Sequence, residues 1–271
     1  MEILVCVKQV PDTAEVKIDP VKHTVIRAGV PNIFNPFDQN ALEAALQIKD
    51  ADKDNVKVTL LSMGPDQAKD VLREGLAMGA DDAYLLTDRK LGGSDTLATG
   101  YALAQAIKKL AADKGIEQFD IILCGKQAID GDTAQVGPQI ACELGIPQIT
   151  YARDIKVDGN KVTVQQENEE GYIVTEAQFP VLITAVKDLN EPRFPTIRGT
   201  MKAKRRQIPD ITAADIGADD ARIGLGGSPT KVRKIFTPPQ RSGGLVIPVE
   251  DDNEQAVVDQ IVEKLVAQKV L

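Results

Sequence analysis

Short apolar runs and helical repeats alternate through the first half of the chain. Four apolar runs predict buried strands, at residues 3–7, 56–61, 83–86 and 119–123. Four segments with apolar side chains at helical spacing predict helices, at residues 39–49, 67–78, 97–112 and 136–144. Strands that alternate with helices through short loops predict an α/β fold, with a doubly wound parallel sheet that carries helices on both faces.

The pattern changes after residue 147, where segments of β type follow one another without helices. These segments lie at residues 148–157, 161–167, 172–177 and 181–186. The sequence Asp158-Gly159-Asn160, between the first two of them, is typical of a hairpin turn. We therefore expect an antiparallel β-hairpin extension packed on the edge of the sheet.

The last part of the chain lacks an evident core of its own. Residues 207–250 are rich in Pro, Gly, Asp and Ser, and residues 253–270 then place apolar side chains at the spacing of an amphipathic helix. We assign residues 1–206 to the α/β domain with its β extension, and residues 207–271 to an arm that ends in a helix. We expect this arm to embrace a second subunit, although it could also fold back on its own sheet.

The loops that follow the predicted strands should meet at one edge of the sheet. They lie at residues 7–11, 62–64, 94–96 and 125–136. Residues 35–38 would join them if a hairpin predicted at residues 16–27 folds back over the edge. In open α/β sheets, ligands bind outside the carboxyl ends of the strands. We therefore predict a single pocket there, which includes Val7 and Gly64.

The loop after the fourth strand is the strongest candidate for binding an anion. Gly125, Gly131 and Gly137 allow tight turns and a close approach of the backbone to a ligand. The loop leads into a helix, whose first N–H groups lack acceptors within the helix and carry the positive end of its dipole. A pyrophosphate or a ribose phosphate would fit there. Alternatively, Asp130, Asp132 and Thr133 only cap this helix.

A second candidate is the segment Gly92-Gly93-Ser94-Asp95, which precedes another predicted helix. Asp95 or Thr96 could contact a ribose or a phosphate, or Asp95 could only cap the helix. The sequence has neither a Gly-x-Gly-x-x-Gly motif after the first strand nor a Walker A loop. The two commonest nucleotide-binding fingerprints are therefore missing.

Composition and charge exclude several classes of function. The net charge of −8 and the pI near 4.9 argue against a nucleic-acid partner, and no apolar run approaches the roughly 18 residues of a membrane span. The three cysteines show no metal-ligand spacing, and His23 is the only histidine. The first residues lack the features of a signal peptide. We expect a cytoplasmic protein without catalytic residues or a metal site, in which a bound cofactor carries any chemistry.

Motifs spread along the chain resemble those of one family. They are Cys-Val-Lys-Gln-Val-Pro-Asp at residues 6–12, Asn-Pro-Phe-Asp at 35–38, Ala-Met-Gly-Ala-Asp at 77–81, Gly-Lys-Gln-Ala-Ile-Asp at 125–130, Asn-Glu-Pro-Arg at 190–193 and Met-Lys-Ala-Lys at 201–204. In these motifs the chain resembles the β subunit of electron transfer flavoproteins. The resemblance implies a Rossmann-like core, a heterodimer with an α subunit that carries a redox-active FAD, and a C-terminal arm that wraps this partner.

The resemblance also implies an adenine nucleotide bound to this chain. The residues that match the family's nucleotide contacts are Cys6, Asn35, Pro36, Phe37, Asp38, Met63, Gly125, Lys126, Gln127, Ala128, Ile129, Asp130, Gly131, Asp132, Thr133, Ala134, Gln135 and Val136. They belong to the same loops that the predicted topology brings together. The prediction of Val7, Gly64, Asp95 and Thr96 rests on that topology alone.

The family has two branches that differ in this nucleotide. In one branch it is a structural AMP. In the other, typical of anaerobes, it is a second FAD that accepts hydride from NADH. This FAD divides the two electrons between a low-potential carrier, ferredoxin or flavodoxin, and the FAD of the α subunit. The segments Gly-Gly-Ser-Asp-Thr at 92–96 and Asp-Gly-Asp-Thr-Ala-Gln-Val-Gly at 130–137 resemble this second branch. A small residue at 131 and hydroxyl groups at 96 and 133 suit a pyrophosphate that continues to a flavin.

The resemblance further implies a docking site for acyl-CoA dehydrogenases. The matching loop contains Ile197, whose exposed aliphatic side chain would be the anchor. An AMP-binding structural β subunit is the alternative function. A stand-alone nucleotide hydrolase is a third, but the sequence offers no general base or metal-binding group for it.

Overall fold

The computed structural model describes residues 1–12, 17–18, 25–26, 31–233, 244, 246–249 and 253–270. The chain divides into two compact units, Met1–Ile235 and Phe236–Leu271. The second unit contains helix α6 (Glu254–Ala267), which confirms the helix predicted near the end of the chain. In the part of the chain that is described, no helix has both the length and the apolar character needed to cross a membrane.

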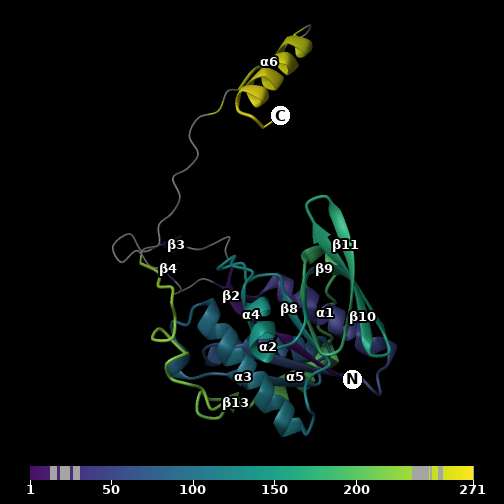
Figure 1. Cartoon of the computed structure of the whole chain (residues 1–271), viewed down its shortest axis with the longest axis vertical. Coiled ribbons are helices and arrows are strands. Elements are labelled where there is room, and N and C mark those ends of the chain that lie inside the picture. The colour runs from purple at the N-terminus through teal and green to yellow at the C-terminus, as the bar shows by residue number, and fades with distance from the viewer. Residues whose placement is uncertain are drawn as a thin grey trace. The chain divides into compact units, whose positions relative to one another are not determined.

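A nine-stranded sheet forms the centre of the first unit (Figure 1). In chain order its strands are β1 (Glu2–Cys6), β6 (Lys57–Met63), β7 (Asp82–Leu86), β8 (Ile121–Gly125), β9 (Gln148–Asp158), β10 (Lys161–Asn168), β11 (Gly171–Gln178), β12 (Val181–Ala185) and β13 (Asp210–Ile211). Their order across the sheet is β11–β10–β9–β12–β8–β1–β6–β7–β13. The chain passes from β1 to β6 and β7 on one side, then returns to β8 on the other side of β1. The topological switch point therefore lies between β1 and β8.

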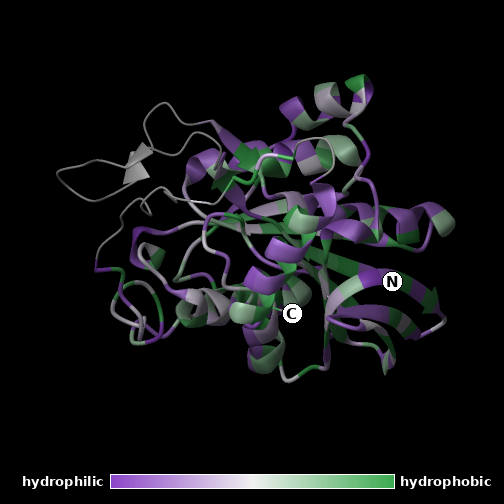
Figure 2. Ribbon diagram, turned by 90° about the horizontal axis from the view of Figure 1, so that it is seen from above, coloured by the Kyte–Doolittle hydropathy of each residue, from purple (hydrophilic) through white to green (hydrophobic). Residues whose placement is uncertain are grey.

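Helices cover both faces of this sheet. They are α1 (Pro36–Ala51), α2 (Lys69–Met78), α3 (Thr96–Lys114), α4 (Val136–Leu144) and α5 (Ile197–Arg205), with short 3-10 helices η2 (Asp66–Ala68), η3 (Arg89–Leu91) and η4 (Lys187–Leu189). Leu42 of α1 belongs to the same core as Ile3 of β1, whereas Ile107 of α3 shares the opposite core with Leu4. Neighbouring residues of β1 thus point to opposite faces. The doubly wound α/β fold is confirmed, and Figure 2 shows the largely hydrophobic central strands between helices of mixed hydropathy.

Two short antiparallel pairs precede α1. Strand β2 (Gln9–Pro11) pairs with β5 (Asn32–Phe34), and β3 (Lys17–Ile18) pairs with β4 (Val25–Ile26). The hairpin predicted at residues 16–27 is confirmed at residues 17–18 and 25–26, which form β3 and β4. Its other positions lie outside the described residues. Pairing of β2 with β5 returns the chain to the end of β1, so residues 35–38 join the carboxyl edge of the sheet.

The β extension differs from the prediction in its last strand. Strands β9, β10 and β11 are antiparallel neighbours and extend from the body of the first unit (Figure 1). However, β12 is parallel to both β8 and β9 and lies between them. All five of its residues are buried, as in a central strand covered on both faces. The extension therefore continues the sheet and does not pack on its edge.

The segment after residue 206 also differs from the prediction. Strand β13 joins the sheet beside β7, and Ile208, Ile211, Ile216 and Ile223 are buried. These isoleucines are separated by polar residues without a helical or strand period, so the sequence pattern did not reveal them. The first compact unit accordingly extends to Ile235, and only the remainder is available as an arm. That this arm wraps a partner stays a prediction.

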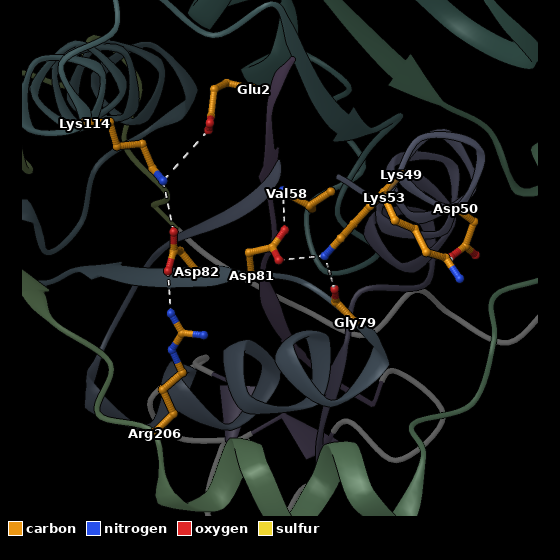
Figure 3. A network of polar contacts seen from close by, with 10 residues as sticks. All are labelled: Glu2, Lys49, Asp50, Lys53, Val58, Gly79, Asp81, Asp82, Lys114 and Arg206. Carbon is orange, nitrogen blue, oxygen red and sulfur yellow. Dashed lines mark hydrogen bonds and ion pairs between the residues drawn. The ribbon is translucent and has the colours of Figure 1, made fainter. Parts of the chain in front are cut away.

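Ion pairs tie three helices to the amino ends of β6 and β7 (Figure 3). Asp81 accepts hydrogen bonds from the backbone N–H of Val58 at 2.8 Å and from Lys49 of α1 at 2.7 Å. Asp82 pairs with Lys114 of α3 at 2.9 Å and with Arg206, which follows α5. These contacts fix the helices at the sheet edge opposite the predicted pocket.

Candidate functional site

A buried carboxylate joins the ends of β1 and β8 at the switch point. Asp38, in the first turn of α1, accepts hydrogen bonds from the backbone N–H of Lys8 at 2.8 Å and of Gly125 at 3.1 Å. A Cβ at Gly125 would lie 2.4 Å from Asp38 Oδ1 and 2.6 Å from the Cβ of Phe37. Only glycine therefore allows α1 to approach β8 this closely.

Burial also changes the acidity of this carboxyl group. Desolvation raises the pKa of Asp38 to about 7, although the hydrogen bonds that it accepts act to lower the pKa. The charge of the Asp38 side chain therefore changes near neutral pH.

Asn35 holds the loop that follows β8. Its side chain is fully buried, its Nδ2 donates to the carbonyl of Gln127 at 2.9 Å, and its Oδ1 accepts from the N–H of Ile129 at 3.2 Å. Its backbone N–H donates to the carbonyl of Lys8 at 3.0 Å. One side chain therefore sets the path of residues 126–130 relative to the end of β1.

The rest of this loop is exposed and leads into α4 without a capping side chain. Residues 130–133 are exposed, and a Cβ at Gly131 would have no atom within 4 Å. Asp132 and Ala134 have positive φ values of 53° and 52°. Asp130 pairs with Lys8 at 2.7 Å and Asp132 accepts from Gln127 at 2.7 Å. Among the described residues, no side chain caps the N-terminus of α4, so the alternative in which Asp130, Asp132 and Thr133 only cap it is wrong.

The segment before α3 lies against the same loop. The hydroxyl of Thr96 donates to Gln135 Oε1 at 2.9 Å and accepts from Gln139 Nε2 at 3.4 Å. Asp95 caps α3, because its Oδ1 accepts from the N–H of Ala98 at 3.1 Å. Its Oδ2 accepts from the N–H and hydroxyl of Thr230 at 3.0 and 2.8 Å.

The capping alternative for Asp95 is therefore confirmed, and both of its carboxylate oxygens are engaged within the chain. Burial would raise the pKa of Asp95, but the hydrogen bonds from Ala98 and Thr230 outweigh burial and lower it. The hydroxyl of Thr96 is likewise used both as donor and as acceptor. Thr96 thus supports the loop 125–136 through Gln135, whereas Asp95 holds Ala98 and Thr230, and both side chains have few hydrogen-bonding positions left for a ligand.

The other predicted residues lie along the same edge. Cys6 and Val7 are buried at and after the end of β1, and the N–H of Val7 donates to the carbonyl of Leu61 at 2.9 Å. Met63 ends β6 and is half-buried. The N–H of Gly64 donates to the carbonyl of Leu86 at 3.1 Å. The structure therefore brings the predicted residues together around β1, β6 and β8.

The sequence analysis placed Lys8 at this edge only as part of the loop 7–11, without a role, and it missed Tyr151 altogether. Lys8 forms the ion pair with Asp130 that spans from the end of β1 to the loop, and its place directly after the first strand was the available signal. The ammonium of Lys126 lies 4.9 Å from the ring centroid of Tyr151 in β9. No sequence signal placed Tyr151 there, because its position depends on the unexpected pairing of β9 with β12.

A hollow of about 520 Å³ lies beside the start of α1. Its lining includes Pro36, Gln39 and Asn40, and across from them Lys187 and Pro192. Of the predicted nucleotide contacts, only Pro36 belongs to this lining, so the hollow adjoins the loop 125–136 without containing it.

Ile197 lies apart from these loops, at the first position of α5. Its side chain is 84% exposed, as docking to another protein requires. The neighbouring Phe194 is 89% exposed.

Comparisons with known proteins agree with this arrangement. Residues 22–216 match the family model of the electron transfer flavoprotein domain. The chain is 92% identical to an electron transfer flavoprotein subunit beta of Megasphaera elsdenii, over 100% of both chains. It is 51% identical to subunit CarD of the caffeyl-CoA reductase–Etf complex of Acetobacterium woodii, over 98% of each chain. It is 43% identical to the acryloyl-CoA reductase electron transfer subunit gamma of Anaerotignum propionicum, over 100% of both. The chain therefore belongs to the electron transfer flavoprotein family and is of its β-subunit type.

Proposed function

We propose that this chain binds FAD at the carboxyl edge of its sheet and serves as the β subunit of a bifurcating electron transfer flavoprotein. In the heterodimer, electrons from NADH would divide at this FAD. One would pass to ferredoxin or flavodoxin, and the other through the FAD of the α subunit to an acyl-CoA dehydrogenase. The alternative is a β subunit with a structural AMP at the same edge.

The observation that carries the proposal is the uncapped N-terminus of α4 beside an exposed loop. The first N–H groups of a helix attract phosphate, and in the part of the chain that the structure describes no side chain caps this helix. A Cβ at Gly131 would meet no atom within 4 Å, so the loop beside this helix has room for a group as large as a diphosphate. The residues present therefore fit a dinucleotide.

The names of two relatives support the choice of branch and partner. One relative belongs to a caffeyl-CoA reductase complex, and another is the electron transfer subunit of an acryloyl-CoA reductase. Both names contain a reductase of an acyl-CoA compound. A CoA-thioester oxidoreductase is therefore the class of partner that we propose for this chain.

The side chains of this chain would bind and orient the cofactor. Bound FAD supplies the hydride acceptance and one-electron transfer that none of these side chains provides. Asn35 and Asp38 hold residues 125–130 in a fixed path, and backbone N–H groups at the start of α4 would bind the phosphates. Lys8 contributes a positive charge beside the loop, where it now pairs with Asp130.

The test is the nucleotide content of the purified αβ heterodimer. We expect two FAD per heterodimer, measured from the visible spectrum and from chromatography of extracted nucleotides. We also expect NADH to reduce the flavin of the β subunit. One FAD together with one AMP would overturn the proposal in favour of the structural alternative.

A further inference from the structure

Apolar side chains gather on the exposed surface of residues 194–201, which we call the docking segment. Phe194 is 89% exposed, Ile197 is 84% exposed and Met201 is 57% exposed. The inference below rests on the proposed function and on the docking role that the family resemblance implies for Ile197 of this segment.

An ion pair fixes the residue just before the docking segment. Arg193 donates from Nε to Glu43 Oε2 at 2.7 Å and from a terminal nitrogen to Glu43 Oε1 at 2.9 Å. Its backbone N–H also donates to Glu43 Oε2 at 3.1 Å, and it pairs with Asp50 at 2.8 Å. The side chain of Glu43 is only 5% exposed. Arg193 is therefore held to α1 through both its side chain and its backbone.

A reciprocal amide pair reinforces this attachment. Asn40 of α1 donates to the carbonyl of Asn190 at 2.7 Å, and Asn190 donates to the carbonyl of Asn40 at 3.0 Å. Glu43 and Asn40 lie three residues apart on α1, so they share one face of the helix. This face of α1 therefore holds both ends of the motif Asn190-Glu191-Pro192-Arg193.

The docking segment is also fixed at its middle and just beyond its end. Thr196 caps α5 by accepting from the N–H of Gly199 at 2.9 Å. A Cβ at Gly199 would lie 2.3 Å from the carbonyl oxygen of Ala77, so α5 rests directly on α2. Beyond α5, Arg206 pairs with Asp82 (Figure 3). The apolar side chains are thus exposed on a segment whose backbone is held at several points.

A buried ion pair is a weak source of net stability, because desolvation offsets much of the attraction. Its bidentate hydrogen bonds do, however, define the position and orientation of the two groups. We propose that Arg193 is a positioning residue for partner recognition, which acts through Glu43 to hold the docking segment on α1 without contacting the partner itself.

The test uses the αβ heterodimer with its cofactors and a partner acyl-CoA dehydrogenase. The double variant Arg193→Met with Glu43→Gln removes the ion pair without leaving one buried charge unpaired. The matched control is Arg222→Met with Glu143→Gln, which removes a different arginine–glutamate pair, between residue 222 and α4. We expect the first variant to raise the KM of the dehydrogenase for the heterodimer about tenfold, which is about 1.4 kcal/mol. We expect kcat, FAD content and NADH-dependent flavin reduction to stay unchanged, and the control to change none of these values.

A second comparison separates positioning from direct contact. Ile197→Ala should raise the same KM, and it should add little in the Arg193→Met/Glu43→Gln background, since Ile197 is already misplaced there. An unchanged KM for the double variant, or full additivity with Ile197→Ala, would overturn the positioning role alone. If Ile197→Ala itself has no effect, the docking proposal and this inference both fail.

A milder variant covers the case in which the double variant does not fold. Arg193→Lys keeps the charge but loses the bidentate geometry. We expect it to raise the KM by a smaller factor and to speed amide hydrogen exchange at residues 197–205. Wild-type exchange and KM in this variant would overturn the inference.

Discussion

At the scale of single residues, this site depends on backbone groups that a few side chains hold in place. Asn35 and Asp38 orient the loop after β8, while Gly125 allows their close approach. The sequence pointed to these residues through their position after predicted strands. It could not show that both carboxylate oxygens of Asp95 accept hydrogen bonds within the chain, because one partner, Thr230, lies far away in the sequence.

Substitution of Gly131 tests whether phosphates lie against the exposed loop. We expect Gly131→Glu to lower the FAD content of the heterodimer from two toward one, because the added carboxylate repels a diphosphate. Gly226→Glu is the matched control, since Gly226 is also exposed and has no atom within 4 Å of its Cβ position. Flavin content measured from the visible spectrum decides the result, and equal FAD content in both variants would contradict the predicted placement.

Replacement of Asp38 tests the carboxylate that joins β1 and β8. Asp38→Asn keeps one acceptor but directs an NH₂ group at the other N–H donor. At about pH 4, where folded Asp38 keeps its proton and its two oxygens can still accept, we expect the substitution to lower the free energy of unfolding by about 1–3 kcal/mol. The denaturation midpoint of the heterodimer in urea measures this change, with Asp113→Asn in an exposed ion pair as the control. Equal midpoints for the two variants would show that the bridge contributes nothing.

The raised pKa of Asp38 also predicts how stability depends on pH. The folded protein keeps this proton up to a pKa of about 7, whereas the unfolded chain releases it near 3.8. Its contribution to stability is therefore complete below pH 3.8 and is lost as the pH rises through about 7. Between these values, the wild type should lose about 1.4 kcal/mol per pH unit relative to Asp38→Asn. Parallel curves of unfolding free energy against pH would contradict this.

At the scale of elements, the sequence predicted the strands and helices of the first half because their apolar periods are regular. It misplaced β12, since a short apolar run fits an antiparallel hairpin as well as a buried parallel strand. It also missed the packing of residues 208–223, whose buried isoleucines follow no period. In both cases, the position is set by contacts with distant segments that no local pattern encodes.

The close packing of α5 on α2 can be disturbed by a single methyl group. Gly199→Ala places a methyl group 2.3 Å from the carbonyl oxygen of Ala77, so α5 must move away from α2. We expect a loss of about 1–3 kcal/mol in stability and a higher KM for the dehydrogenase. Gly226→Ala provides the control, because its Cβ meets no atom within 4 Å. Wild-type values of both quantities for Gly199→Ala would show that α5 tolerates the shift.

At the scale of the whole molecule, the division into two units separates folding from assembly. The first unit carries both hydrophobic cores, whereas the described part of the second contains one helix with exposed Val258, Ile261 and Val262. A helix with such a stripe is typical of a segment that packs on another surface. The α subunit is the partner that the family provides.

Removal of residues 236–271 tests this division of roles. We expect the shortened chain to lose only the helical signal of α6 in circular dichroism and to keep the helices and strands of the first unit, because both cores remain. We expect it to lose stable association with the α subunit in size-exclusion chromatography. Full heterodimer formation by the shortened chain would show that the arm is dispensable.

The two edge strands of the sheet are unequal in length. One is the two-residue strand β13, and the other is the eight-residue strand β11, with Tyr172, Ile173 and Val174 more than half exposed. Among the described residues, no strand pairs with the outer side of β11. A long edge strand has unpaired backbone N–H and C=O groups and is therefore a template for pairing with other chains. When the chain is produced without its α subunit at high concentration, we therefore expect it to self-associate through β11. The substitution Ile173→Lys should suppress this self-association.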